Sequence, residues 1–485
     1  MIHPLRRGLP ARLLAFLLVL VGAPSTDAQR SANPHDARVR GFERDALRYG
    51  ARAAESGRAL LPMLEIERLR NDATPGVADA ALVRLAASRR LLPHVRAYAT
   101  MLRGLGELAT GDPSVAEATF ASLGYVREWM IVGAFDNEGK TGLDEVMPPE
   151  AARSATVDRG ARYPGREREV GWRAYPAELS PTGYVSFDAT LRPWVNVCAF
   201  AETFVDLPEA GPHTLWFGAA GAAKVWFNGE EILRDEAYRN HDFERFGVMV
   251  PGRRGANRVL VKVCTGEGSW GFSLRMGDRN GAPLPETRVR AQGPTEAAPA
   301  PASPAALPDA PVAPLANLEA LVEARPEGRN GAAARFDLAR FLLWTGAQDE
   351  ACRRVFELAA AAAELDPSVA HLLFASEIAE TRAERMRFVA QAEERSPRDP
   401  AVRLARAQLV ATGPDPGQAL RTLSASALPG RFGLDADWLL ATLYERRDLP
   451  RVALAIIDRN IARTGGAVSW VRRKGRAIDN QGRRA

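Results

Sequence analysis

The sequence contains few of the residues that build catalytic and metal centres. It has 3 cysteines and 6 histidines in 485 residues, and no two cysteines are spaced as Cys-x-x-Cys. It also lacks the Gly-x-Ser-x-Gly, His-Glu-x-x-His and Gly-x-x-x-x-Gly-Lys patterns, which carry serine nucleophiles, zinc and phosphate. These absences argue against a disulfide-built scaffold and a zinc site, and they predict a protein that is not an enzyme.

Long hydrophobic runs are also absent, except near the start of the chain. Arg6, Arg7 and Arg12 precede an apolar run over residues 13–21, and small residues at 26–28 suit a signal peptidase. A signal anchor is the alternative, but a membrane span needs about 20 apolar residues. We therefore expect residues 1–28 to be a cleaved signal peptide, and the mature protein to be periplasmic or secreted without stable membrane insertion.

Charge of one sign is not in large excess. Lys and Arg total 64 and Asp and Glu total 59, so the formal net charge is only +5. A nucleic-acid-binding protein would need a basic patch that dominates the chain. The sequence therefore predicts no nucleic-acid partner.

The texture of the sequence changes along the chain and predicts several domains of α and β type. Apolar residues recur at helical spacing before residue 123, alternate with a period of two between residues 129 and 276, and return to helical spacing after residue 315. A Pro- and Ala-rich stretch, too poor in large apolar residues to form a core, separates the last two parts. The expected domains are a helical domain (36–123), a β-sandwich (125–287), a linker (288–315), helical repeats (316–466) and a basic tail (467–485).

The strands of the middle domain are predicted by alternation and by turn residues. Asn228-Gly229 between two such runs indicates a hairpin, because this dipeptide supplies the two positive φ angles of a type I′ turn. Two of the cysteines, Cys198 and Cys264, lie on expected strands, so a disulfide between them is one option and two buried thiols are the other. The expected strands are 129–135, 184–191, 195–205, 213–217, 224–233, 243–250, 258–264 and 271–276.

The helical segments show a weak repeat. Asp366-Pro367 and Asp399-Pro400 lie 33 residues apart, close to the period of about 34 of tetratricopeptide repeats. The later helices resemble four degenerate tetratricopeptide units, and we expect solenoid segments on either side of the β-sandwich. A solenoid normally ends in a polar capping helix, which the sequence before Ala485 does not indicate, so we expect a partner or further sequence to cover that end.

The middle domain carries a recognisable order of motifs. Trp129 begins a Trp-x-x-x-Gly-x-Phe-Asp-Asn-Glu-Gly segment, followed by the Asn228-Gly229 hairpin and by a Pro-Gly-x-x-Gly-x-Asn strand from Pro251. This order resembles the galactose-binding-like jelly rolls that accompany many glycoside hydrolases. The whole arrangement also resembles the front part of larger exported bacterial proteins that end in a transglutaminase-like domain. After Leu315 the only Cys and His are Cys352 and His371, so the resemblance does not extend to that chemistry.

Candidate binding residues lie in the jelly-roll region. Trp194 follows a proline and Trp270 lies in a Gly-rich loop, so both are candidates for a surface on which a sugar ring stacks. The alternative is core packing, which large aromatics on strands usually serve. Tyr238 and His241 belong to a polar cluster that is either a ligand site or an ordinary exposed loop.

A structural calcium is the only cofactor that the sequence raises. Asp136, Glu138 and Asp144 crowd one loop with Gly139 and Gly142, and hard oxygen ligands on a turn can hold this ion. A polar loop without a metal is the alternative.

These observations lead to one main hypothesis and two others. The main hypothesis is a non-enzymatic exported scaffold that binds a protein or peptide partner through its helical repeats, with the jelly roll as a second ligand-binding module. The others are a carbohydrate- or peptidoglycan-binding module, and the accessory part of a transglutaminase-like system.

Overall fold

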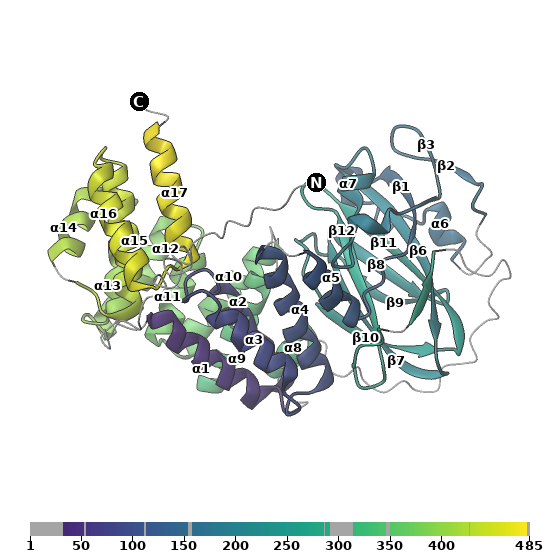
Figure 1. Cartoon of the computed structure of the whole chain (residues 1–485), viewed down its shortest axis with the longest axis horizontal. Helices are drawn as coiled ribbons and strands as arrows, with labels where there is room; N and C mark the ends of the chain where they lie inside the picture. Colours follow the sequence, from purple (N-terminus) through teal and green to yellow (C-terminus); the bar gives the residue numbers. More distant parts are fainter. Residues whose placement is uncertain are drawn as a thin grey trace, which may run out of the picture.

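The computed structural model describes residues 33–52, 55–110, 113–153, 158–285, 287–291, 314–345, 350–425 and 427–482. The chain is a mixed α and β protein in which a helical part and an antiparallel β part lie side by side (Figure 1). The expected signal peptide, residues 1–28, and most of the expected linker, residues 292–313, lie outside the described residues. Among those that are described, no helix has the length and apolarity that crossing a membrane requires.

Three of the helices before the β part begin at a proline, at Pro34, Pro93 and Pro113. Pro34 occupies the first turn of the first helix, and the side chain of Asn33 accepts a hydrogen bond from the backbone N–H of His35. Proline suits this position because its missing N–H has no partner there in any helix. The five helices are α1 (Pro34–Tyr49), α2 (Ser56–Arg68), α3 (Val77–Ala87), α4 (Pro93–Thr110) and α5 (Pro113–Ser122).

The β part consists of two antiparallel sheets with a shared apolar core. One sheet has the strand order β4-β1-β6-β11-β8-β9, with β13 beside β6, and the other has the order β10-β7-β12-β5. Alternate residues of both sheets fill the space between them, Phe217, Val261 and Phe272 among them. The strands are β1 (Met130–Asp136), β4 (Arg173–Ala174), β5 (Tyr184–Ser186), β6 (Val197–Leu207), β7 (Gly211–Ala220), β8 (Ala222–Phe227), β9 (Glu230–Asp235), β10 (Phe246–Gly252), β11 (Gly255–Thr265), β12 (Gly271–Gly277) and β13 (Arg288–Arg290).

Two expectations about this part need correction. The expected strand 184–191 ends at Ser186, because the Ser186 hydroxyl accepts a hydrogen bond from the Ala189 N–H and caps the short helix α7 (Phe187–Thr190). The expected linker was placed too early, since β13 still pairs with β6. The hairpin between β8 and β9 matches its prediction, with φ angles of 51° at Asn228 and 87° at Gly229.

The outer face of the larger sheet is covered by the segment between β1 and β5. This segment contains α6 (Pro148–Ala151) and the small pair β2 (Arg162–Pro164) and β3 (Glu169–Gly171). Trp172 from this segment joins Phe200 of β6 and Trp226 of β8 in a second apolar core. Cys198 and Cys264 lie opposite each other on β6 and β11 and form a disulfide in the same layer.

Helices return after the β part and form an arc. After α8 the helices follow one another in pairs. The first helices of successive pairs, α9, α11, α13 and α15, begin 41, 31 and 30 residues apart, so the repeat is irregular. The expected basic tail is wrong for residues 468–482, because they form a helix whose Trp470 and Arg473 are buried. The helices are α8 (Pro314–Glu323), α9 (Gly328–Trp344), α10 (Glu350–Leu365), α11 (Val369–Ile378), α12 (Arg382–Arg395), α13 (Pro400–Ala411), α14 (Pro416–Ala425), α15 (Gly430–Glu445), α16 (Pro450–Arg463) and α17 (Val468–Gly482).

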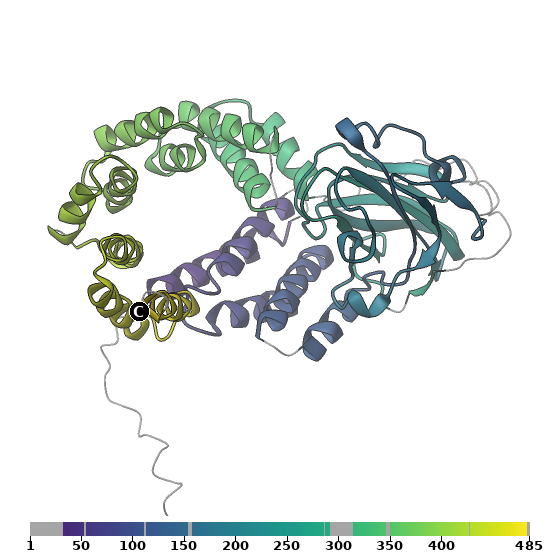
Figure 2. The same cartoon turned by 90° about the horizontal axis from the view of Figure 1, so that it is seen from above.

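The helices before and after the β part belong to one body. At one end of the arc α8 and α9 pack on α2, and at the other end the loop between α16 and α17 contacts the start of α1 and the loop after α2 (Figure 2). At this second contact the Asn33 amide donates hydrogen bonds to the carbonyls of Asp72 and Thr464, at 2.9 and 3.3 Å. Ser469 donates its backbone N–H to the carbonyl of Asn71, at 2.9 Å. We call this contact the seam.

The helical part also packs on the outer face of the smaller sheet. The ring of His94 in α4 stacks on Trp216 of β7, with centroids 5.8 Å apart. Buried Arg275 of β12 donates two hydrogen bonds to Glu244, at 2.6 and 2.8 Å, and Tyr125 donates a third, at 2.9 Å. The two parts thus share a buried interface, and the hydrogen bonds of Glu244 hold its β side in place.

Candidate functional site

A polar pocket lies at one end of the two sheets, where their loops face α10. Its volume is about 640 Å³, which is within the range of small-molecule sites. The walls come from the loops before β6, after β7, between β9 and β10, and between β11 and β12, while Lys140 contributes from the loop after β1. Cys352 of α10 lies on the opposite wall. We call this cavity the loop-end pocket.

The pocket is held in shape by a buried asparagine. Asn137 follows β1 and is fully buried, and its amide donates hydrogen bonds to the Tyr238 hydroxyl and the Thr265 carbonyl, at 3.1 and 3.0 Å. Its oxygen accepts a hydrogen bond from the backbone N–H of Gly142, at 2.9 Å. One side chain therefore ties together three loops that are distant in sequence.

Two cations line the loop-end pocket. The Lys140 ammonium lies 4.7 Å from the centre of the Tyr238 ring, a cation–π distance. Arg239 donates a hydrogen bond to Asp235, at 2.9 Å, and both side chains are 9% exposed. Burial raises the pKa of Asp235, although Arg239 opposes the shift. The Nε of Arg239 is buried and has no hydrogen-bond partner among the described residues.

The residues that the sequence suggested for ligand binding do not lie at one site in the structure. Tyr238 lines the loop-end pocket, whereas Trp194 is 41% exposed and lies outside its lining. Of the two alternatives for Trp270, a stacking surface is wrong and core packing is confirmed, because the side chain is fully buried. Its indole N–H donates to the Val263 carbonyl, at 2.9 Å, and its ring packs 5.2 Å from that of Phe187.

His241 also lies away from the pocket lining, among aromatic rings. Its ring contacts Tyr184 and Phe243, each with centroids 4.5 Å apart, and burial lowers its pKa to about 3. Its Nε2 lies 2.8 Å from the Ser273 hydroxyl. A serine beside a histidine can act as an activated nucleophile, but Ser273 is 1% exposed within β12 and no substrate reaches it.

The structure does not gather the residues expected to bind calcium. Asp136 and Glu138 form ion pairs with Arg166, at 3.2 and 2.7 Å, while Asp144 pairs with Arg234, at 2.7 Å. Within the described ranges, no three His, Cys, Asp or Glu side chains lie together as a metal site would need. A calcium ion at this loop remains a prediction, and binding would require Arg166 to move.

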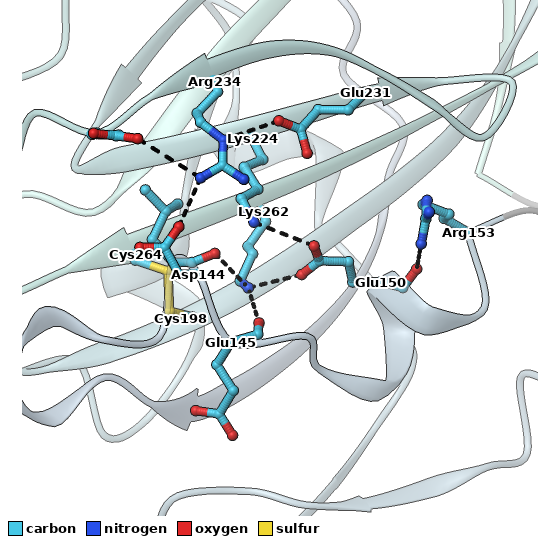
Figure 3. A network of polar contacts seen from close by, with 12 residues as sticks. Asp144, Glu145, Glu150, Arg153, Cys198, Lys224, Glu231, Arg234, Lys262 and Cys264 are labelled. Atoms are coloured by element: carbon cyan, nitrogen blue, oxygen red, sulfur yellow. Dashed lines mark hydrogen bonds and ion pairs between the residues drawn. A yellow bond between two sulfur atoms is a disulfide. The ribbon is translucent and has the colours of Figure 1, made fainter.

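A buried charged network that was not predicted from the sequence lies under the covering segment (Figure 3). Lys224 of β8 and Lys262 of β11 share the carboxylate of Glu150, at 3.3 and 2.9 Å, and all three are almost completely buried. Lys262 also donates to the carbonyls of Leu143 and Glu145, at 3.1 and 2.7 Å. The available signal was a lysine within each of two apolar runs, residues 222–227 of β8 and 259–264 of β11. The network fixes the covering segment to the sheet, close to the disulfide.

A second missed cluster lies where α4 meets the loop before β10. Arg245 is 1% exposed, and none of its three side-chain nitrogens has a hydrogen-bond partner within the described part of the chain. Burial lowers the pKa of Arg245 to about 10 and raises that of Asp242 to about 6. The Tyr98 hydroxyl and one Asp242 oxygen are likewise buried without a partner. Ordered water commonly satisfies such groups.

Comparisons with known proteins add little to this geometry. No protein-family model matches the chain, and no curated protein matches it. Two structures of a β-glucosidase from Kluyveromyces marxianus, one in complex with glucose and one labelled with selenomethionine, align at 12% identity with a TM-score of 0.20. The alignments cover 31% and 49% of this chain, and only 16% and 23% of the β-glucosidase chains. Likeness at this level carries no argument about fold or activity.

Proposed function

We propose that the chain is a non-enzymatic, exported binding protein in which a galactose-binding-like jelly roll carries a ligand site and tetratricopeptide-like helices form the scaffold. The observation that carries the proposal is the loop-end pocket, which is built by loops of both sheets and closed on one side by α10. Loops on a rigid β scaffold are a frequent location for binding sites. The wall from α10 couples this site to the helical arc.

The lining of the loop-end pocket favours a polar ligand such as a glycan. Asn196, Asn240, Thr265 and Ser269 supply amide and hydroxyl groups, and Tyr238 supplies the one aromatic ring among the described lining residues. Hydroxyl-rich ligands need many donors and acceptors of this kind. Trp270, which the sequence offered as a stacking platform, takes no part because it belongs to the core.

A binding screen of the purified protein against glycans and peptidoglycan fragments tests the proposal. We expect saturable binding that Ser269→Trp abolishes, because Ser269 is exposed at the pocket and a large ring would fill the cavity. Arg254→Trp is the matched control, since Arg254 is exposed at the opposite end of β11. Equal binding by both variants would place the ligand elsewhere.

A protein or peptide partner on the helices is the second candidate. Charged groups from three other helices, α2, α9 and α15, lie close enough to affect the Arg38 guanidinium of α1. Burial and Arg431 lower the pKa of Arg38, and Glu65 raises it. Charged side chains that approach one another across a curved array of helices suit a charged extended peptide. We expect Arg38→Ala and Arg431→Ala to weaken binding of acidic peptides on an array, while leaving glycan binding unchanged.

A further inference from the structure

The charges that line the loop-end pocket are unequal. Lys140 and Arg239 are cationic, and Glu267, on the exposed β11–β12 loop, is the one carboxylate among the described lining residues. No carboxylate of the described residues lies within ion-pair distance of Lys140, which is exposed and lies over the Tyr238 ring. The ammonium is therefore available to a ligand.

Arg239 is the more buried of the two cations, and one of its hydrogen-bond donors has no acceptor among the described residues. Nine tenths of its side chain is buried, and Asp235 accepts a hydrogen bond from one terminal nitrogen. The Nε donor is left unmet, and a buried donor on a charged group costs more than an ordinary unmade hydrogen bond. Because this atom is itself buried, an oxygen acceptor in the pocket meets it only when the Arg239 guanidinium turns towards the cavity. An anionic oxygen does so best, because charge-assisted hydrogen bonds are the stronger kind.

The other residues that line the loop-end pocket favour an acidic sugar over a simple inorganic anion as the ligand. Amide and hydroxyl side chains surround the cations, and about 640 Å³ is far more than a single inorganic anion fills. We propose that the loop-end pocket binds a saccharide that carries a carboxylate, with Arg239 and Lys140 as the groups that recognise the carboxylate. This inference rests on the proposed function and names the class of its ligand.

Calorimetric titration of the purified protein with trigalacturonate, neutral galactotriose and inorganic phosphate tests the inference. We expect trigalacturonate to bind at least about tenfold more tightly than galactotriose, and the difference to shrink in high salt. Lys140→Gln should weaken trigalacturonate binding about fivefold, and Arg239→Gln more strongly, because Arg239 is the buried group. The exposed Lys140 provides a variant that does not threaten folding, and Arg254→Gln is the control for lost positive charge.

Each result of these titrations either supports the inference or overturns a stated part of it. Tighter binding of galactotriose, or equal binding of both sugars, would overturn the carboxylate specificity and leave a glycan-binding function intact. If phosphate binds as tightly as trigalacturonate, the proposal that the ligand is a saccharide is overturned. Binding of none of the three would overturn the inference, and the separate glycan and peptidoglycan screen would then decide the proposed function. Unchanged affinity in both Lys140→Gln and Arg239→Gln would remove these residues from the site.

Discussion

Single residues show how burial decides what a tryptophan does. Trp270 and Trp194 were both candidates for a surface position, yet one fills the core and the other is 41% exposed. The difference comes from partners distant in the sequence, since Trp270 packs against Phe187 and donates to Val263.

The two tryptophans should therefore respond differently to truncation. We expect Trp270→Ala to lower the free energy of unfolding by about 3–5 kcal/mol, because it leaves a large cavity between the sheets. Trp194→Ala should change the free energy by less than about 0.5 kcal/mol. Urea titrations followed by circular dichroism measure both. A small effect at Trp270 would contradict its placement in the core.

Two buried histidines should make the fold sensitive to acid. Burial lowers the pKa of His94 to about 4 and that of His241 to about 3, below the unfolded value of about 6.5. The unfolded chain therefore binds more protons between these values, and stability is lost as the pH falls from 6.5 towards 4. Asp242, with its pKa raised to about 6, acts in the opposite direction, since the folded state there holds the extra proton.

Unfolding experiments at pH 7 and pH 4.5 on single variants separate these contributions. We expect His94→Gln and His241→Gln each to reduce the loss of stability between the two pH values, and Asp242→Asn to increase it. Variants that all keep the slope of the parent protein would show that these groups titrate normally.

Among elements, the covering segment between β1 and β5 depends on one carboxylate. Glu150 is the shared partner of buried Lys224 and Lys262, so Glu150→Gln leaves two buried ammonium groups without an anion. We expect a loss of about 3–5 kcal/mol and faster hydrogen exchange in residues 137–153. Glu145→Gln is the matched control, because Lys262 contacts only its backbone carbonyl and its side chain is exposed (Figure 3). Equal stability of the two variants would contradict the network.

The disulfide adds a second constraint on the same layer. Cys198 and Cys264 are 66 residues apart, so their bond limits a long loop in the unfolded chain. Replacing both with alanine should cost roughly 2–4 kcal/mol in the chain-entropy model. The same loss should follow reduction of the parent protein, and reduction should leave the double variant unchanged. A stability that does not respond to reductant would show that the bond adds nothing.

The sequence predicted regular elements better than irregular ones. Strands such as β11 alternate over many residues, and helices such as α13 begin at a capping aspartate followed by proline, so local pattern was enough. The covering segment was missed because its strands have only two or three residues, too few to show a period. The prediction of a basic tail was wrong because it considered the many charged residues and not Trp470, whose buried side chain anchors α17.

At the scale of the whole molecule, the candidate site lay beyond sequence reasoning. Tyr238 was named from its polar neighbours, but the loop-end pocket also needs Lys140 and Cys352, which are more than 200 residues apart. No local pattern brings such residues together. The same holds for the seam, where Asn33 and Thr464 meet across 431 residues.

The seam differs from the other helix contacts because it is polar. The apolar core around α1 to α4 and the core around α14 to α17 share no residue, and hydrogen bonds of Asn33, Thr74 and Ser469 join the two ends. We expect a double variant, Asn33→Ala with Thr74→Val, to speed hydrogen exchange over residues 464–470 by about tenfold or more. Thr422→Val, which removes a hydroxyl within α14, is the control. Unchanged hydrogen exchange would show that other contacts hold the two ends of the seam together.

A polar closure between two separate cores also has a mechanical consequence. Tension applied to the chain ahead of Asn33 falls first on a few hydrogen bonds, which individually contribute little net stability and have no packed apolar core behind them. We therefore expect the seam to yield before α2 separates from α8 or either core is pulled apart. A modest load would then open the arc at the seam, and the contact would form again when the load is released.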